Sequence, residues 1–223
     1  MKKFLTAVGA LLLTLSTLLF TLSASILGNS YYLPYFRGQM QTNGIEAVTG
    51  RSMDDLMRLS RNLISYLQTG RDSLLSGDFA HHEILHMQDV YQLYRIATMI
   101  CIGTAILCLI LGYLFFLHRR GSDENRLRLR YLWRSMTVYY ILIAIVIIAC
   151  IIDFYGMFML FHEIFFTNDL YLLDPRSDLL IQLLPEQFFA RISLRIALWH
   201  LLGYSIVFAA ALYRSRNHKK RHH

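Results

Sequence analysis

The sequence predicts an all-α integral membrane protein: a bundle of four transmembrane helices with an extracytoplasmic helical cap and a membrane-surface or re-entrant segment. Two observations predict this class. Of the 223 residues, 55% are hydrophobic and only 17% are charged, whereas a soluble domain is about one quarter charged. The apolar residues also gather in four long runs, not in the alternating pattern of a membrane β-barrel. These features exclude a soluble enzyme and favour a single membrane domain over 1–223.

The four runs predict membrane spans at about 4–27, 96–117, 136–161 and 196–213. Because a helix rises about 1.5 Å per residue, roughly 20 residues cross a hydrocarbon core of about 30 Å. The first run follows two lysines, as a secretory signal does. It is longer than the roughly 7–15 apolar residues of a signal, so we expect a retained helix.

The basic side chains predict the orientation of these spans. Lys2–Lys3, an expected inner loop at 118–134 and the stretch after the last span hold 13 of the 22 Lys and Arg residues but two of the 15 acidic ones. Because basic short loops stay in the cytoplasm, both termini and this loop are predicted to be cytoplasmic. The positive charge therefore reflects topology, and no nucleic-acid-binding motif accompanies it.

The first outer segment, 28–95, is predicted to contain a capping helix. Ser52 and Asp55 have the spacing of an N-terminal capping box. Apolar residues then recur at helical spacing, and Gly70 is a typical stop signal. This amphipathic pattern predicts the helical cap.

The second outer segment, 162–195, is too apolar and aromatic for an ordinary solvent loop. Pro175 and Pro185 interrupt it, so we expect a membrane-surface or re-entrant segment. Non-helical backbone at that depth must line a cavity or pack on protein, which predicts a pocket at the outer membrane face.

Four ionisable residues mark this predicted pocket. His86 precedes the second span and His162 follows the third, so both are expected near the outer interface. Asp153 and Arg195 lie in or beside apolar runs, where a charge must be paired or face water. They form either a structural pair, mutual or assisted by Arg95, or a polar lining of the pocket.

The stretch His82-Glu83-Ile84-Leu85-His86 matches the H-E-x-x-H zinc motif. A zinc site needs a third protein ligand. His162, Glu163 and His200 are candidates, but no spacing selects one of them. A membrane zinc hydrolase or protease is therefore one alternative, and a non-catalytic membrane scaffold is another.

Two further strings carry a family resemblance. They are His86-Met87-Gln88-Asp89-Val90, and Phe161-His162 continuing through Leu172-Leu173-Asp174-Pro175 and Leu184-Pro185 to Phe188-Phe189. Together with four spans and a large first outer loop, they make the chain resemble the bacterial lipoprotein intramolecular transacylase family over essentially its whole length.

The resemblance implies an enzyme of the bacterial cell membrane whose active site faces outward. Such an enzyme moves the sn-2 acyl chain of a diacylglyceryl-cysteine lipoprotein to the α-amino group of the same cysteine, which yields a lyso-form lipoprotein. The implied catalytic pair is His86 and His162, without a metal or other cofactor. The implied partners are the diacylated lipoprotein and membrane lipid.

Histidine suits this chemistry because its ordinary pKa of about 6.5 allows it to act as base and as acid near neutral pH. Our hypothesis is that His86 accepts the amine proton, while His162 stabilises the oxyanion or protonates the leaving oxygen. Reversed roles and an acyl-histidine intermediate remain open. Asp89 and Asp174 are candidates for orienting the rings, with helix or turn capping as the alternative.

Overall fold

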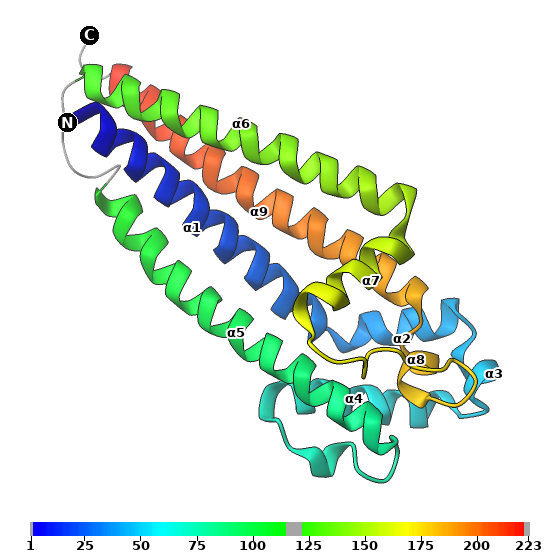
Figure 1. Ribbon diagram of the computed structural model, residues 1–223. Helices are drawn as coiled ribbons and strands as arrows, with labels where there is room; N and C mark the ends of the chain where they lie inside the picture. Colours follow the sequence, from blue (N-terminus) through cyan, green and yellow to red (C-terminus); the bar gives the residue numbers. More distant parts are fainter. Residues whose placement is uncertain (1, 115–121, 221–223) are drawn as a thin grey trace. The chain divides into compact units, whose positions relative to one another are not determined.

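The computed structural model describes residues 2–114 and 122–220, and within these ranges the regular structure is helical (Figure 1). The predicted all-α class is confirmed. In chain order the helices are α1 (Lys2–Ser30), α2 (Leu33–Thr42), α3 (Ile45–Thr49), α4 (Met53–Thr69), a 3₁₀ turn (Asp72–Leu74), α5 (His81–Gly112), α6 (Ser122–Ile152), α7 (Phe154–Phe165), α8 (Leu179–Leu183) and α9 (Glu186–Lys220).

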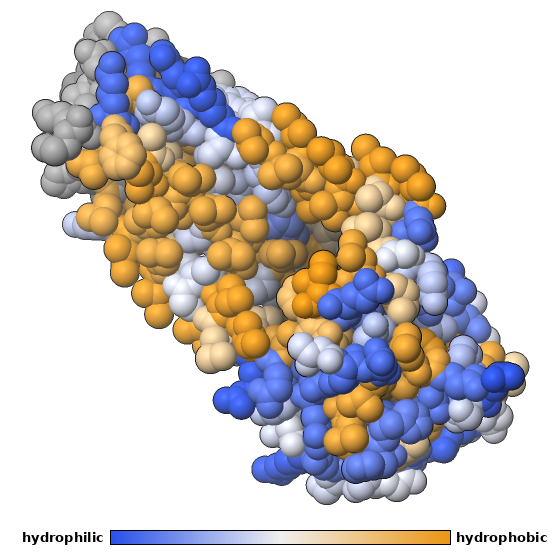
Figure 2. Space-filling model, in the orientation of Figure 1, coloured by the Kyte–Doolittle hydropathy of each residue, from blue (hydrophilic) through white to orange (hydrophobic). Residues whose placement is uncertain are grey.

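Among the described residues, four helices are long and apolar enough to cross a membrane, as the sequence predicts. They are Lys3–Ser30, His81–Gly112, Arg126–Ile152 and Glu186–Ala209. Apolar side chains gather on the surface of these long helices, whereas hydrophilic ones predominate over α2–α4 (Figure 2). An exposed apolar surface of this extent is typical of a protein that lies in lipid.

The third apolar run departs from the expected single span at 136–161. It is divided at Asp153, where α6 ends and α7 begins. The Asp153 carboxylate accepts the N–H of Gly156 at 2.8 Å and so caps α7. An aspartate that bonds to the backbone in this way competes with a continuous helix.

The expected inner loop at 118–134 is also shorter than predicted, because α6 already begins at Ser122. Residues 115–121 lie outside the described part of the chain. The remainder of the predicted loop is therefore helical.

The described residues fall into two compact units. The first unit comprises residues within 1–25, 98–151 and 197–223, and the second comprises 26–97 and 152–196. Helices α1, α5, α6 and α9 contribute residues to both.

Hydrogen bonds join the apolar helices of the first unit. The hydroxyls of Thr14 on α1 and Ser135 on α6 are 2.7 Å apart. His200 on α9 is only 1% exposed. Its Nδ1 lies 2.9 Å from the Thr21 hydroxyl, and its Nε2 contacts the hydroxyl of Tyr139. Such bonds hold helices together where lipid offers no polar partner.

The second unit contains the predicted amphipathic helix as α4. Ser52 accepts the N–H of Asp55 at 3.3 Å, and Gly70 ends the helix with φ +68°. The buried face of α4 packs into the largest apolar core of the unit. The buried members of this core are Met40, Ile45, Leu56, Met57, Leu59, Leu63, Tyr66, Leu75, Phe79, Met87, Leu180 and Leu183.

An ion network fastens α4 to the loop that follows it. Arg58 donates to Asp55 at 2.7 and 2.9 Å and to Asp78 at 2.8 Å through two nitrogens. Hydrogen bonds from Arg51 and Arg58 lower the pKa of Asp55, and the hydrogen bond from Arg58 lowers the pKa of Asp78. Both carboxyls are therefore stabilised in their charged form.

We predict that Arg58→Gln lowers the melting temperature in detergent at pH 7 by about 2–4 °C, which corresponds to about 1 kcal/mol. Because the folded-state pKa values are lowered, the stabilisation is present above the ordinary Asp pKa of 3.8 and is lost as the pH falls through the lowered values. The difference between parent and variant should therefore shrink at acidic pH. A difference that grows on acidification would contradict the prediction.

Candidate active site

The second unit brings two predicted site residues together. His86 lies near the start of α5, and His162 lies near the end of α7. Their ring centroids are 6.1 Å apart, and the ring planes are inclined by 31°. Both side chains are buried, with exposed fractions of 7% and 8%. Residues 76 positions apart in the chain thus form one buried imidazole pair.

Aromatic side chains surround the pair. Phe166 lies 5.3 Å from the His86 ring and 5.5 Å from the His162 ring. Tyr171 stacks on His162 at 5.0 Å, and Phe158 meets the same ring edge-on at 4.4 Å. These rings keep bulk water from the imidazoles and lower the local dielectric constant, which strengthens interactions with charge that develops there.

The backbone of α7 fixes the hydrogen position on His162. Its Nδ1 lies 2.7 Å from the carbonyl oxygen of Phe158. Because a carbonyl only accepts hydrogen bonds, Nδ1 carries the proton and the neutral ring keeps a lone pair on Nε2. Burial lowers the pKa of His162, although the bond to Phe158 opposes this effect. At pH 7 the ring is therefore a neutral base.

His86 has a buried ring nitrogen without a hydrogen-bond partner within the described residues. This nitrogen, Nδ1, is inaccessible to solvent. An unsatisfied buried polar atom costs about 1–3 kcal/mol. A polar group of a bound substrate would recover part of this cost.

Asp89, the predicted orienting residue for His86, makes a different contact. Its carboxylate accepts the side-chain N–H of Asn168 at 2.9 Å. This bond connects α5 to the segment that follows α7. Sequence reasoning missed Asn168, Phe158 and Tyr171, because no local pattern distinguishes them from other polar or aromatic residues.

Asp174 matches the alternative prediction of a turn-capping role. Its two carboxylate oxygens lie 3.1 and 3.0 Å from the Arg176 guanidinium, and one accepts the Arg176 N–H at 2.9 Å. The group is thus engaged within its own Asp-Pro-Arg turn.

Asp153 and Arg195 are engaged with different partners. Asp153 caps α7, as described above. The Arg195 Nε donates to the Asn29 side-chain oxygen at 2.5 Å. Its guanidinium lies 5.2 and 5.1 Å from the ring centroids of Tyr32 and Tyr35. Cation–π contacts and a charge-assisted hydrogen bond to a neutral amide therefore hold the arginine.

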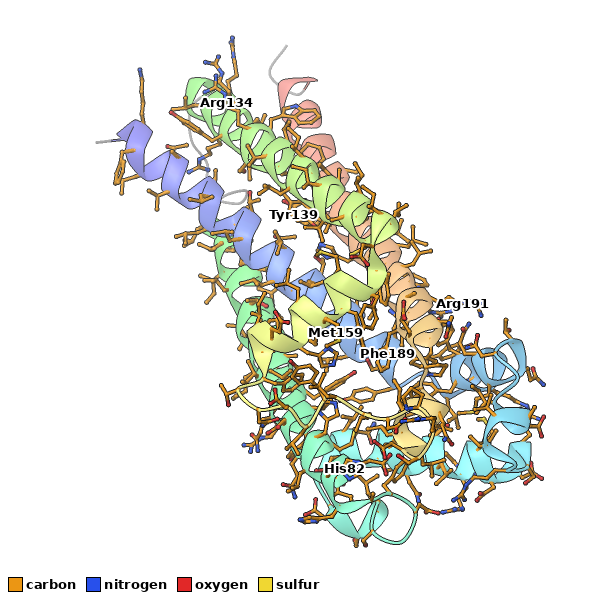
Figure 3. The ribbon with its side chains drawn as sticks, turned by 45° about the vertical axis from the view of Figure 1, so that its right-hand side comes forward. His82, Arg134, Tyr139, Met159, Phe189 and Arg191 are labelled. Carbon is orange, nitrogen blue, oxygen red and sulfur yellow. The ribbon has the colours of Figure 1, made fainter. Side chains whose placement is uncertain are left out.

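The H-E-x-x-H residues do not assemble as a zinc site. Glu83 is 2% exposed, and its two oxygens accept the backbone N–H groups of Ala80 and Leu180, each at 2.6 Å. The His82 Nε2 lies 3.1 Å from a carboxylate oxygen of Asp178; Figure 3 labels His82 at the start of α5. Within the described residues, no three His, Cys, Asp or Glu side chains are placed to share a metal ion.

Of the suggested third ligands, His162 lies beside His86, but within the described residues the two do not belong to a three-ligand group. Glu163 is exposed on α7, and His200 belongs to the first unit, where Thr21 and Tyr139 occupy its nitrogens. The zinc alternative is therefore not favoured.

Helix α7 is held against the start of α9. The rings of Phe158 and Phe189 have centroids 5.0 Å apart; in Figure 3, the labels on Met159 and Phe189 mark these two stretches. This packing supports the turn of α7 that precedes His162.

The family model for the lipoprotein intramolecular transacylase Lit matches residues 11–189, most of the chain. The chain belongs to the lipoprotein intramolecular transacylase family. It is accordingly an enzyme of that class, as the resemblance implied, and its four apolar helices fit a membrane protein.

Solved structures support the same fold. The membrane integral lipoprotein intramolecular transacylase Lit from Bacillus cereus is 22% identical, with a TM-score of 0.81 over 99% of both chains. A variant of that protein with a histidine replaced by arginine gives 19% identity and a TM-score of 0.77, over 98% of this chain and 95% of the variant. A variant with a histidine replaced by alanine gives 21% identity and a TM-score of 0.76, over 99% of this chain and 97% of the variant.

No protein with a curated description matches the chain significantly in sequence. The family assignment therefore rests on the family model, and the solved structures support the fold.

The contact between Asp153 and Gly156 allows the capping role of Asp153 to be tested. A Cβ on Gly156 would lie 2.2 Å from an Asp153 carboxylate oxygen, so we predict that Gly156→Ala disrupts the cap. The expected cost is about 1 kcal/mol of stability, with reduced transacylation because α7 carries His162. Thermal unfolding and lipoprotein product analysis measure both effects.

Asp153→Asn separates capping from charge, because asparagine is an equally good N-cap. Parent-like activity is expected for this variant. Loss of activity in a normally stable Asp153→Asn protein would instead favour the polar-lining interpretation.

Proposed function

We propose that this transacylase moves the sn-2 acyl chain of a diacylglyceryl-cysteine lipoprotein to the α-amino group of that cysteine by acid–base catalysis between His86 and His162. The product is an N-acylated lyso-form lipoprotein. The observation that carries the proposal is the buried ring pair, 6.1 Å apart, with aromatic side chains around it. No cofactor is needed, since the reaction exchanges an ester for an amide without redox change.

The hydrogen bond at His162 supports a specific assignment of roles to His162 and His86. The neutral amine attacks the ester carbonyl, and the Nε2 lone pair of His162 accepts the proton that the nitrogen then loses. His86 donates an N–H to the oxyanion of the tetrahedral intermediate. This assignment is the reverse of our first hypothesis, which remains the alternative together with an acyl-histidine intermediate.

Collapse of the intermediate completes the transfer. The new C–N bond is kept, the bond between the carbonyl carbon and the sn-2 oxygen breaks, and protonated His162 returns its proton to that oxygen. The net result is transfer of the acyl group from the sn-2 oxygen to the amine nitrogen and of one proton from that nitrogen to the oxygen. Because amine and ester belong to one molecule, positioning replaces a bimolecular encounter and is worth several kcal/mol.

We also infer the placement in the membrane from the distribution of basic residues. With both termini cytoplasmic, the imidazole pair lies at the extracytoplasmic face of a bacterial cell membrane. In this arrangement α2–α4 form the helical cap, and the segment 162–195 lies on the membrane surface within a single membrane domain over 1–223. Exposed apolar residues such as Ile164 and Leu172, at 67% and 58%, suit contact with lipid and with the substrate acyl chains.

We predict that His86→Ala and His162→Ala each reduce formation of lyso-form lipoprotein by about 10²–10⁴-fold, because each removes an acid–base group. The measurement is mass spectrometry of lipoprotein N-terminal peptides from cells whose only transacylase is the variant. His81→Ala, an exposed histidine on the same helix, is the matched control and should retain parent activity. Undiminished product from either alanine variant would remove that residue from the mechanism. Undiminished product from both variants would favour a non-catalytic scaffold.

Metal removal distinguishes the zinc alternative. We expect that a strong zinc chelator leaves transacylation by the purified enzyme unchanged, because Glu83 and His82 bind protein groups instead of a shared metal position. Metal analysis of the same sample should give far less than one zinc per chain. Chelator-sensitive activity restored by zinc would overturn this expectation.

A further inference from the structure

Glu83 is a buried carboxylate whose two oxygens bind backbone from two parts of the chain. One oxygen accepts the N–H of Ala80, immediately before α5, and the other accepts the N–H of Leu180, in the first turn of α8; both distances are 2.6 Å. The N–H groups of a first helical turn have no partner within their own helix. Glu83 therefore satisfies one orphan donor on each side and ties α5 to α8.

The two parts that Glu83 joins both belong to the candidate active site. His86 follows Glu83 on α5 by three residues, so both side chains lie on the same buried face of that helix. Helix α8 directly follows the segment 166–178, whose Phe166 and Tyr171 contact the His162 ring. One carboxylate thus connects the helix of the first imidazole to the segment packed against the second.

Among the described residues, two further polar contacts join α5 to this segment, but they are more exposed. The His82 side chain, which faces Asp178, is 48% exposed, and the bond between Asp89 and Asn168 is also exposed. Water can replace such bonds at little cost. The buried Glu83 bridge has no such substitute.

We propose that Glu83 is a positioning residue for the acid–base pair: by tying α5 to α8, it holds His86 at its distance from the His162 ring. This inference rests on the proposed roles of the two histidines. Displacement of a catalytic group by about 1 Å can cost about 10²-fold in rate. The bridge therefore matters for turnover as well as for folding.

Glu83→Gln tests the proposal, because the amide keeps one acceptor oxygen and replaces the other with a group that only donates. In lipid nanodiscs with a synthetic diacylated lipopeptide, kcat per folded enzyme should fall about 10–100-fold, with KM changed less than about 3-fold. Glu46→Gln is the matched control. One oxygen of its carboxylate accepts the Met53 N–H at 2.8 Å, between α3 and α4. A glutamine oxygen can keep this bond, so thermal stability and kcat should both stay close to those of the parent.

Glu83→Asp keeps the carboxylate but is one methylene too short to bind both N–H groups. This variant replaces Glu83→Gln in the test if the glutamine variant does not fold. Its kcat should fall as well. A parent-like kcat in a folded Glu83 variant would overturn the positioning role while leaving the two-histidine mechanism intact. Full activity of His86→Ala would instead overturn the mechanism, and chelator sensitivity of the parent enzyme would assign Glu83 to zinc chemistry.

Discussion

The burial of two imidazoles beside each other is the constraint on which the second unit depends. A ring at 7–8% exposure cannot rely on water for its hydrogen bonds or for its orientation. The carbonyl of Phe158 supplies one bond, and aromatic rings supply the packing. The surrounding polar contacts, from Glu83 and Asp89, attach the elements around the pair to one another. If the proposed mechanism holds, the interactions that fold this part of the chain also orient the reacting groups.

Aspartate fulfils several different tasks around this pair. Asp153 starts the short helix that carries His162, Asp174 stabilises a turn, and Asp89 holds Asn168. Each carboxylate accepts hydrogen bonds from backbone or side-chain donors of the protein. These acidic side chains thus bind other groups of the protein, and in the proposed mechanism the two imidazole rings carry out the chemistry.

Much of the fold could be predicted from the sequence, because apolar length and helical spacing are local properties. The four apolar helices and α4, with its Ser52 cap and Gly70 stop, were found in this way. The histidine pair was selected by its expected depth and by the family resemblance. The break at Asp153 was missed because it lies inside an apolar run long enough for one span. The bridge from Glu83 to Leu180 could not be predicted, since no sequence spacing reports a contact across 97 positions.

The bond between His162 and the Phe158 carbonyl has a consequence for the proposed catalytic cycle. With Nδ1 anchored, the ring cannot turn over to exchange its nitrogens without losing that bond. Any proton gained at Nε2 must leave from Nε2, so the resting form is restored as soon as the product hydroxyl forms. In this mechanism the ring does not have to exchange tautomers between turnovers. The turnover time then depends on substrate entry, acyl transfer and product departure.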